Sequence, residues 1–311
     1  MNPSSKTTPV YIGRFAPSPT GPLHLGSLYT ALASFLDARH HQGKWLVRID
    51  DVDTPRNTPG AASLILKTLE AFGLHWDETI YYESQHINRY ESALARLKAL
   101  NLLYPCTCSR KHLTDYAHHH GGGDRYPGIC RDKNFHEQND YAVRIKTDNG
   151  VIEFFDRLQG EFSEHLNAVH GDFIIKRKDQ LFAYQLAVVV DDQAQGVTHV
   201  VRGIDLLDST SKQIFLQTLL GYRPPSYMHL PILVDEKGQK LSKQTYAQAV
   251  DQRNPSAVLF HLLQLLKQAP PEELINSLPQ EILQWGISHW HPAPLQSWTQ
   301  LCPSNGFAGL N

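Results

Sequence analysis

Residues 14–27 read RFAPSPTGPLHLGS, and this stretch decides the fold. Residues 10–16 have the character of a strand, two prolines stiffen the turn that follows, and the apolar spacing predicts a helix over residues 24–39. In open α/β sheets, ligands bind at the carboxyl ends of the strands, and a helix N-terminus offers N–H groups and a positive dipole to phosphate. The glycines of the stretch permit close approach of a nucleotide. The whole stretch therefore predicts a nucleotide site, although His24 taken alone fits an ordinary surface residue.

The chain beyond this stretch alternates strands and helices. A strand is predicted over residues 45–49, and Asp50 follows it directly, while helices are predicted over residues 59–72 and 86–100. This order favours a parallel sheet with crossover helices, so the fold class is α/β. Further strands are expected over residues 142–145, 151–155, 173–175, 181–190 and 197–202, and a further helix over residues 206–220.

A second motif, KLSKQ, occupies residues 240–244. Lysines in a loop of this kind can close over a triphosphate, and Lys243 would act as a point charge on the negative charge that develops at the α-phosphate. The pentapeptide alone is typical of a solvated loop. Together with the first motif, in this order and at this separation, it indicates a single nucleotide site.

The composition excludes several classes of protein. The chain has 311 residues, 41% of them hydrophobic, and 29 basic residues against 31 acidic ones, which argues for a folded protein and against a polybasic nucleic-acid binder. Residues 1–9 are expected to form a disordered tail without the apolar core of a secretory signal. No apolar run reaches membrane-spanning length, so we expect a soluble cytoplasmic protein with no membrane partner.

Three of the four cysteines lie close together in the sequence, at Cys106, Cys108 and Cys130. The surrounding segment is rich in Gly and His and cannot bury much apolar surface, so a structural zinc ion is a suitable means of ordering it. The run His118–His120 is one source of a fourth ligand. The simpler alternative is three free thiols in a loop.

The two motifs resemble the HIGH and KMSKS signatures of class I aminoacyl-tRNA synthetases, with HLGS at residues 24–27 and KLSKQ at residues 240–244. Residues 14–21 and the acidic strand end at residues 47–53 are similar to glutamyl-tRNA synthetases in particular. The 67 residues after residue 244 are too few for the anticodon-binding region of that family. The chain therefore resembles a truncated branch of the family.

The resemblance implies an enzyme of the ligase type that activates glutamate with ATP and magnesium, without tRNA. It then transfers glutamate to the queuosine base at the wobble position of tRNA(Asp). The implied fold is a Rossmann-like catalytic domain with a zinc-bearing α+β insertion and a short helical C-terminal region. The implied boundaries are residues 10–103 and 181–244 for the two halves of the nucleotide-binding domain, residues 104–180 for the insertion, and residues 245–311 for the helical end.

The resemblance also implies roles for individual residues. Two arginines suit the two carboxylates of glutamate and one aspartate suits its ammonium group, because guanidinium pairs bidentately with carboxylate. The expected glutamate site is Arg14, Ala16, Ser18, Asp50, Tyr184 and Arg202. The expected ATP site is Pro17, Thr20, Gly21, His24, Gly26, Lys240 and Lys243, with His24 and Lys243 as the catalytic residues. The expected zinc ligands are Cys106, Cys108, Tyr126 and Cys130, with Tyr126 chosen over the histidine run by the resemblance alone.

The chain departs from the family pattern in three places. Ser27 stands where the first signature ends in His, and the second signature has Leu241 and ends in Gln244. Asp50 stands where the family usually has Glu, which shortens its reach by about 1 Å. Three alternatives remain: a truncated synthetase that charges a tRNA 3′ end, a non-catalytic RNA-binding paralogue, and a nucleotidyltransferase that makes another adenylate.

Overall fold

The computed structural model describes residues 10–120, 123, 125–133, 140–241 and 250–303. The expected tail at residues 1–9 and the motif residues 242–244 lie outside the described residues. The helices are α1 Leu25–His40, α2 Ala61–Ala71, α3 Ile87–Ala99, α4 Arg110–His120, α5 Leu166–Val169, α6 Tyr184–Ala194, α7 Thr210–Leu219, α8 Pro255–Leu265 and α9 Pro279–His289. The strands are β1 Ile12–Phe15, β2 Lys44–Ile49, β3 Tyr81–Tyr82, β4 Leu103–Cys106, β5 Ala142–Ile145, β6 Val151–Asp156, β7 Gly160–His165, β8 Phe173–Lys176, β9 His199–Gly203, β10 Ser226–Leu230, β11 Ile232–Leu233 and β12 Gln300–Leu301.

Two parallel groups of strands meet in the middle of the molecule. Strands β1, β2 and β3 pair in parallel, and β10 pairs in parallel with β9 on one side and β6 on the other. The backbone N–H of Thr198 donates to the carbonyl of Ile12 at 2.9 Å, so the two groups adjoin between β1 and β9. The strand order reverses here, and the crevice at such a switch point is where ligands bind in α/β folds.

One predicted element is wrong. Residues 181–190 were expected to form a strand, but the chain is helical from Tyr184 to Ala194, as α6. Every residue from Leu186 to Asp192 is buried, so the sequence lacks the one-sided apolar pattern that marks a helix with an exposed face. A continuous apolar run of this length does not distinguish a buried helix from a buried strand.

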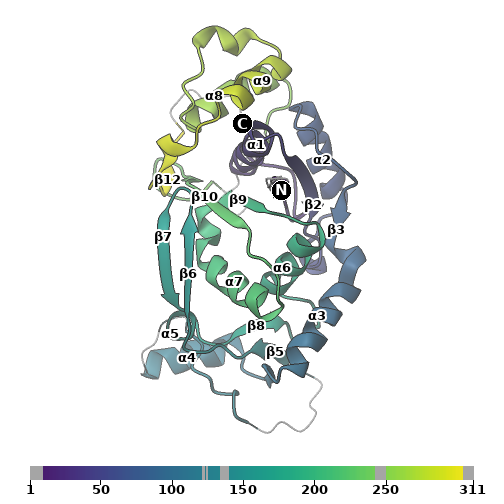
Figure 1. Ribbon diagram of the computed structural model, residues 1–311, viewed down its shortest axis with the longest axis vertical. Helices are drawn as coiled ribbons and strands as arrows, with labels where there is room; N and C mark the ends of the chain where they lie inside the picture. The colour runs from purple at the N-terminus through teal and green to yellow at the C-terminus, as the bar shows by residue number, and fades with distance from the viewer. Residues whose placement is uncertain (1–9, 121–122, 124, 134–139, 242–249, 304–311) are drawn as a thin grey trace, which may run out of the picture.

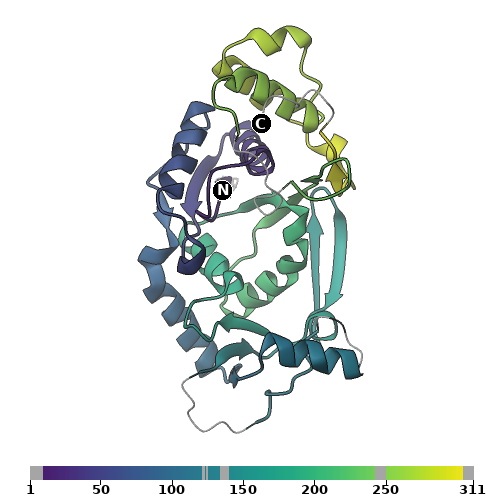
Figure 2. The same cartoon turned by 180° about the vertical axis from the view of Figure 1, so that it is seen from behind.

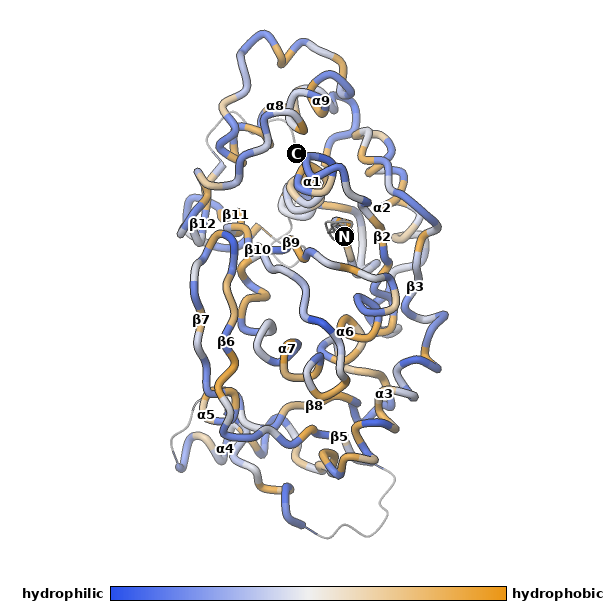
Figure 3. The backbone as a smooth tube through the Cα atoms, in the orientation of Figure 1, coloured by the Kyte–Doolittle hydropathy of each residue, from blue (hydrophilic) through white to orange (hydrophobic). Residues whose placement is uncertain are grey.

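The largest part of the core lies around α1. Leu28, Leu32 and Leu36 are fully buried, and they share one apolar cluster with α8 and α9. These two helices lie next to α1 at the upper end of the molecule (Figure 1). The hydropathy colouring shows both polar and apolar residues along α3, as expected for a helix with one buried side (Figure 3).

The opposite end of the molecule holds a separate antiparallel sheet in the order β4-β5-β8, with α4 beside it. Strand β7 pairs with β6 as an antiparallel hairpin, which runs along one side of the molecule while α2 and α3 run along the other (Figure 2). The expected strands at residues 142–145, 151–155 and 173–175 are confirmed, with slightly different bounds. Among the described residues, no helix combines the length and apolarity that a membrane span requires.

A buried carboxylate ties α9 to the first strand. Asp37 on α1 is fully buried and accepts hydrogen bonds from the hydroxyl of Tyr11, the guanidinium of Arg157 and the indole Nε1–H of Trp290, the last at 2.8 Å. We expect Trp290→Phe to lower the free energy of unfolding by about 1.5–3 kcal/mol, because a hydrogen bond to a buried charge is lost. Urea unfolding followed by circular dichroism measures this. Trp298→Phe is the control, since Trp298 is 45% exposed, and an equal effect of the two substitutions would contradict the prediction.

Candidate functional site

A cavity of about 720 Å³ opens at the carboxyl ends of β1 and β9, at the switch point of the sheet. Its wall includes most of the residues that the sequence motifs singled out, from five separate parts of the chain. The expected residues that line it are Arg14, Ala16, Pro17, Ser18, Thr20, His24, Gly26, Asp50, Tyr184, Arg202 and Lys240. Gly21 is buried behind the wall with a φ of +142°, a conformation that favours glycine, and Lys243 lies outside the described residues.

Three buried charged groups come from three strands. Arg14 lies on β1, Asp50 directly follows β2, and Arg202 lies on β9; their exposed fractions are 4%, 8% and 4%. Parallel strands bring these groups to one edge because their carboxyl ends coincide. The pairing of two guanidiniums with a carboxylate in one cavity matches the charges of an acidic amino acid.

The remaining expected residues of this end are less buried. Tyr184 is the first residue of α6 and 37% exposed, and its hydroxyl lies 3.4 Å from Nη1 of Arg202. Ala16 and Ser18 lie on the turn after β1. The backbone N–H of Asp50 donates to the carbonyl of Pro17 at 3.0 Å, which fixes this turn against the end of β2.

The other end of the cavity is formed by the start of α1. His24 is the N-cap residue of this helix, and its Nδ1 accepts the backbone N–H of Ser27 at 3.2 Å. The hydroxyl of Ser27 lies 3.0 Å from Nε2 of His24. Ser27, which replaces the final His of the family signature, therefore contacts His24, the first residue of that signature. The positive end of the α1 dipole therefore lies at the cavity wall, where phosphate is favoured.

The two sequence motifs lie side by side. A Cβ atom added at Gly26 would lie 3.4 Å from the carbonyl oxygen of Leu241, which leaves little room for a larger residue there. The ammonium group of Lys240 forms an ion pair with Asp205 at 2.6 Å. The described part of the second motif, residues 240–241, thus lies at the start of α1 and borders the same cavity as the first motif.

A network of buried charges, which the sequence motifs did not reveal, supports this wall. Asp192 on α6 accepts from Nη1 of Arg48 at 2.6 Å and from Nε of Arg14 at 3.3 Å, while Nε of Arg48 donates to Asp50 at 2.7 Å. Burial raises the pKa of Asp192, but Arg14 and Arg48 outweigh this effect and hold the pKa below its ordinary value. Asp192 is therefore ionised at neutral pH.

For the carboxyl group of Asp50, the effect of burial on the pKa outweighs the effect of the neighbouring arginines. Burial raises its pKa, and the pull of Arg48 and Arg14 in the opposite direction is not sufficient to restore the ordinary value. Burial and the neighbouring Asp50 also raise the pKa of Glu83, to about 10, so Glu83 is neutral at neutral pH. A cation bound beside Asp50 would lower its pKa, so the site favours a positively charged group there.

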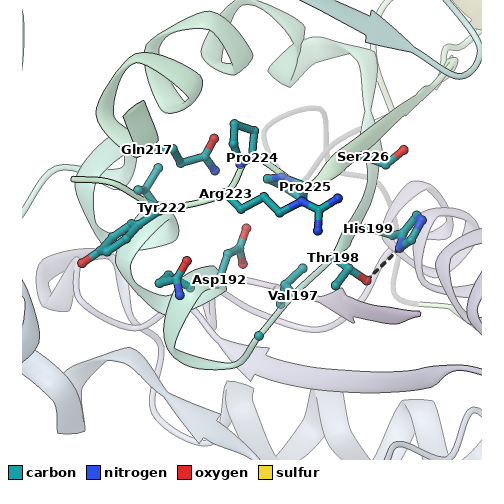
Figure 4. Close-up of a pocket in the computed structure, with 13 residues that line it drawn as sticks. Asp192, Val197, Thr198, His199, Gln217, Tyr222, Arg223, Pro224, Pro225 and Ser226 are labelled. Atoms are coloured by element: carbon teal, nitrogen blue, oxygen red, sulfur yellow. Dashed lines mark hydrogen bonds between the residues drawn. The ribbon is translucent and has the colours of Figure 1, made fainter. Parts of the chain in front are cut away.

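A second cavity, of about 360 Å³, lies at the opposite edge of the sheet (Figure 4). It is bordered by the first residues of β9 and β10 and by Arg223 on the loop between α7 and β10. Of the residues expected at the site, it contains none. Asp192 is common to both regions, because it lines this cavity and also holds Arg14 at the first one.

The expected metal ligands come together in the antiparallel end of the molecule. The Sγ atoms of Cys106, Cys108 and Cys130 lie within 4.8 Å of one another, and that of Cys108 is 3.6 Å from that of Cys130. The hydroxyl oxygen of Tyr126 lies 3.4 Å from the Cys106 sulfur and 4.0 Å from the Cys108 sulfur. Zinc–sulfur bonds of about 2.3 Å at tetrahedral angles separate ligand sulfurs by about 3.8 Å, so this donor set fits zinc.

The thiol of Cys130 has a lowered pKa, which favours the thiolate form that binds a metal cation. Burial alone would raise its pKa, but hydrogen bonds from the backbone of Thr107 and from Tyr126 lower the pKa to about 7. Burial raises the pKa of Cys108 to about 12 in the absence of a cation. The run His118–His120 lies at the C-terminal end of α4, and among the described residues it does not join the cysteine cluster.

The fold and the first cavity together define the catalytic domain of a class I tRNA synthetase. Residues 11–266 match the family model described as tRNA synthetases class I (E and Q), catalytic domain, and the chain belongs to this family. A solved glutamate-tRNA synthetase from Elizabethkingia anophelis has the same fold. Its TM-score is 0.79 at 24% identity, with 96% of this chain and 69% of that one covered.

The similarity is higher to a narrower group of relatives. The chain is 50% identical to the glutamyl-Q tRNA(Asp) synthetase of Thiobacillus denitrificans, over 94% of this chain and 95% of that protein. It is 51% identical to the protein of the same name from Dechloromonas aromatica, over 90% of this chain and 94% of the relative. The resemblance to the truncated branch of the family is thereby confirmed.

Proposed function

We propose that the chain activates glutamate with ATP and transfers it to the queuosine base at the wobble position of tRNA(Asp). The observation that carries this proposal is the cavity in which Arg14, Asp50 and Arg202 lie beside the start of α1 and Lys240. Two cations and one anion complement the two carboxylates and the ammonium group of glutamate. The names of the relatives support the nucleic-acid substrate.

The reaction consists of two displacements. A carboxylate oxygen of glutamate attacks the α-phosphorus of ATP, and the bond to pyrophosphate breaks, which leaves glutamyl-adenylate. A hydroxyl group of the queuosine ring then attacks the carbonyl carbon of this mixed anhydride; AMP leaves with the bonding electrons, and the hydroxyl proton is released to solvent. Positioning and charge stabilisation suffice for both steps.

Residues of both motifs have separate roles in this scheme. Arg14 and Arg202 hold the carboxylates, Asp50 holds the ammonium group, and Tyr184, Ala16 and Ser18 complete the glutamate pocket. The backbone of the turn from Pro17 to Gly21, with His24, Gly26 and Lys240, holds ATP. Lys243 carries its charge to the α-phosphate, and magnesium bound to ATP neutralises further phosphate charge.

The substitution Lys243→Ala is expected to change kcat and to leave the KM for glutamate nearly unchanged, which distinguishes a catalytic role from a role in glutamate binding. We expect the kcat of glutamate-dependent ATP–pyrophosphate exchange to fall about 100-fold, because the cation that the proposal assigns to the transition state is lost. The KM for glutamate should change little. Lys237→Ala is the matched control, since Lys237 is exposed in the same loop and does not line the cavity. Activity that survives the Lys243 substitution intact would contradict the assignment of this loop.

The proposed zinc ion is structural and has no part in the chemistry. Cys106, Cys108, Tyr126 and Cys130 would close a four-coordinate site, which leaves no open position for substrate. We expect Cys130→Ser to remove the metal and to lower the thermal stability of the insertion. Metal analysis of the purified variant measures this, with exposed Cys302→Ser as the control that keeps the metal. Undiminished zinc in the Cys130 variant would exclude it as a ligand.

The nucleic-acid substrate is tested with three purified tRNAs and radiolabelled glutamate. We expect labelling of tRNA(Asp) that contains queuosine, and none of tRNA(Asp) without it. Removal of the 3′-terminal adenosine of the tRNA before the assay should leave the labelling intact, because the acceptor is in the anticodon. Charging of tRNA(Glu) at its 3′ end would overturn the proposal in favour of a truncated glutamyl-tRNA synthetase.

A further inference from the structure

Three neutral side chains accept hydrogen bonds from the guanidinium of Arg202. Its Nε–H donates to Nε2 of His229 at 3.0 Å, Nη1 donates to the side-chain oxygen of Gln213 at 2.8 Å, and Nη2 donates to the hydroxyl of Thr210 at 2.9 Å. A guanidinium has five N–H groups; these contacts use three of them, and Nη1 also donates to the hydroxyl of Tyr184 at 3.4 Å, so one N–H remains, on Nη2. A substrate carboxylate can accept this N–H and, by taking the place of the Tyr184 hydroxyl at the cavity wall, a second N–H from Nη1.

His229 is itself fixed by a buried carboxylate. The imidazole has no exposed surface, and its Nδ1 lies 2.6 Å from Oδ2 of Asp156, which is also fully buried. The other carboxylate oxygen of Asp156 accepts the backbone N–H groups of Leu158, Gln159 and His229, at 3.0, 2.9 and 3.2 Å. Asp156 therefore accepts a hydrogen from Nδ1, and Nε2 presents its lone pair to Arg202. Only this tautomer satisfies both contacts.

The two buried arginines of the cavity, Arg14 and Arg202, differ in their direct partners. Arg14 contacts the carboxylate of Asp192, which also neutralises Arg48. Among the described residues, the side-chain hydrogen-bond partners of Arg202 are an imidazole, a carboxamide and two hydroxyl groups. The guanidinium carbon also lies 5.4 Å from the centre of the Tyr227 ring, and none of these groups is a carboxylate. Arg202 thus keeps a charge that no direct ion pair compensates, in a largely buried position where charge interactions are strong.

We propose that His229 is a positioning residue that, oriented by Asp156, fixes Arg202 as an uncompensated cation for a carboxylate of the amino-acid substrate. The inference rests on the proposed function, because it assigns the ligand of Arg202 as glutamate. A neutral acceptor at Nε is essential to it. A carboxylate in the same place would hold the guanidinium equally well but would compete electrostatically with the substrate.

Two substitutions of His229 separate its two contacts. Asparagine places its amide near the position of Nδ1, so His229→Asn keeps the contact with Asp156 and leaves Nε–H of Arg202 without an acceptor. Glutamine reaches the position of Nε2, so His229→Gln restores an acceptor for Arg202. A third variant, Gln213→Glu, adds a carboxylate on Nη1 and leaves His229 in place, which tests the charge argument even where the first variants fold poorly.

The experiment measures glutamate-dependent ATP–pyrophosphate exchange with the full chain, with folding checked by circular dichroism. We expect His229→Asn to raise the KM for glutamate about 10–100-fold and His229→Gln to raise it less than about 5-fold, with the KM for ATP within about 2-fold in both. Gln213→Glu should also raise the KM for glutamate about 10-fold or more. Equal KM values for the two His229 variants, or an unchanged KM in Gln213→Glu, would overturn the inference. A wild-type chain without glutamate-dependent exchange would instead contradict the proposed function itself.

Discussion

Replacing Asp192 with alanine is expected to lower the free energy of unfolding by about 3–5 kcal/mol, because it leaves a buried cation without its partner. Arg48 has no exposed surface, and its Nη1 donates to Asp192 at 2.6 Å. Asp192 also contacts Arg14, so the same carboxylate joins α6 to β1 and β2. The variant should lose glutamate binding as well as stability, since Arg14 loses its support.

Urea unfolding at pH 7 measures the loss of stability. Asp179→Ala is the matched control, because Asp179 pairs with Arg177 at the surface, where both side chains are more than 40% exposed. The control should change the free energy of unfolding by less than about 1 kcal/mol. An Asp192 variant as stable as the control would show that the buried network has no structural importance.

The effect of Asp192 should also depend on pH. Its pKa in the folded protein lies below the ordinary value, so the ionised carboxylate stabilises the fold above the unfolded-state pKa of about 3.9. As the pH falls below that value, this contribution is lost. We expect the difference in stability between wild type and Asp192→Asn to be complete at neutral pH and to shrink in acid.

Arg202→Gln is expected to lower kcat/KM for glutamate about 1,000-fold, with little change in the KM for ATP. Truncating one partner of a buried, hydrogen-bonded charge pair costs about 2–5 kcal/mol, which corresponds to a factor of this size. Exchange kinetics with glutamate as the varied substrate measure the loss.

The second cavity offers the control for this prediction. Arg223 borders that cavity at the other edge of the sheet, and its substitution by glutamine should leave the exchange kinetics within about 2-fold of wild type (Figure 4). If Arg223→Gln were as damaging as Arg202→Gln, glutamate would have to be assigned to the other cavity.

The sequence predicted the residues that line the main cavity better than the buried residues that hold them in place. Arg14, His24 and Asp50 lie where strands pass into turns and helices, and the topology of an α/β sheet brings such positions to one edge whatever their separation along the chain. A local pattern was therefore enough to place them together. The cysteines are comparable, since their spacing alone indicates that they share a site.

The buried residues that hold the lining in place, such as Asp192 and Asp156, are not marked by any local sequence motif. Asp192 lies 178 residues from Arg14, and Asp156 lies 73 residues from His229. Their contacts depend on the register between strands and on how α6 packs, and α6 was expected to be a strand. The one available hint is polar residues within apolar runs, such as Asp192 after residues 186–190, because a buried charge needs a partner.

The central claim is that one cavity binds glutamate and ATP together and joins them without tRNA. ATP–pyrophosphate exchange, measured with each of the standard amino acids in the absence of tRNA, tests it most directly. The account predicts exchange with glutamate, and none above background with glutamine or aspartate. Exchange that depends on a different acid, or no exchange by the folded wild-type chain, would contradict it.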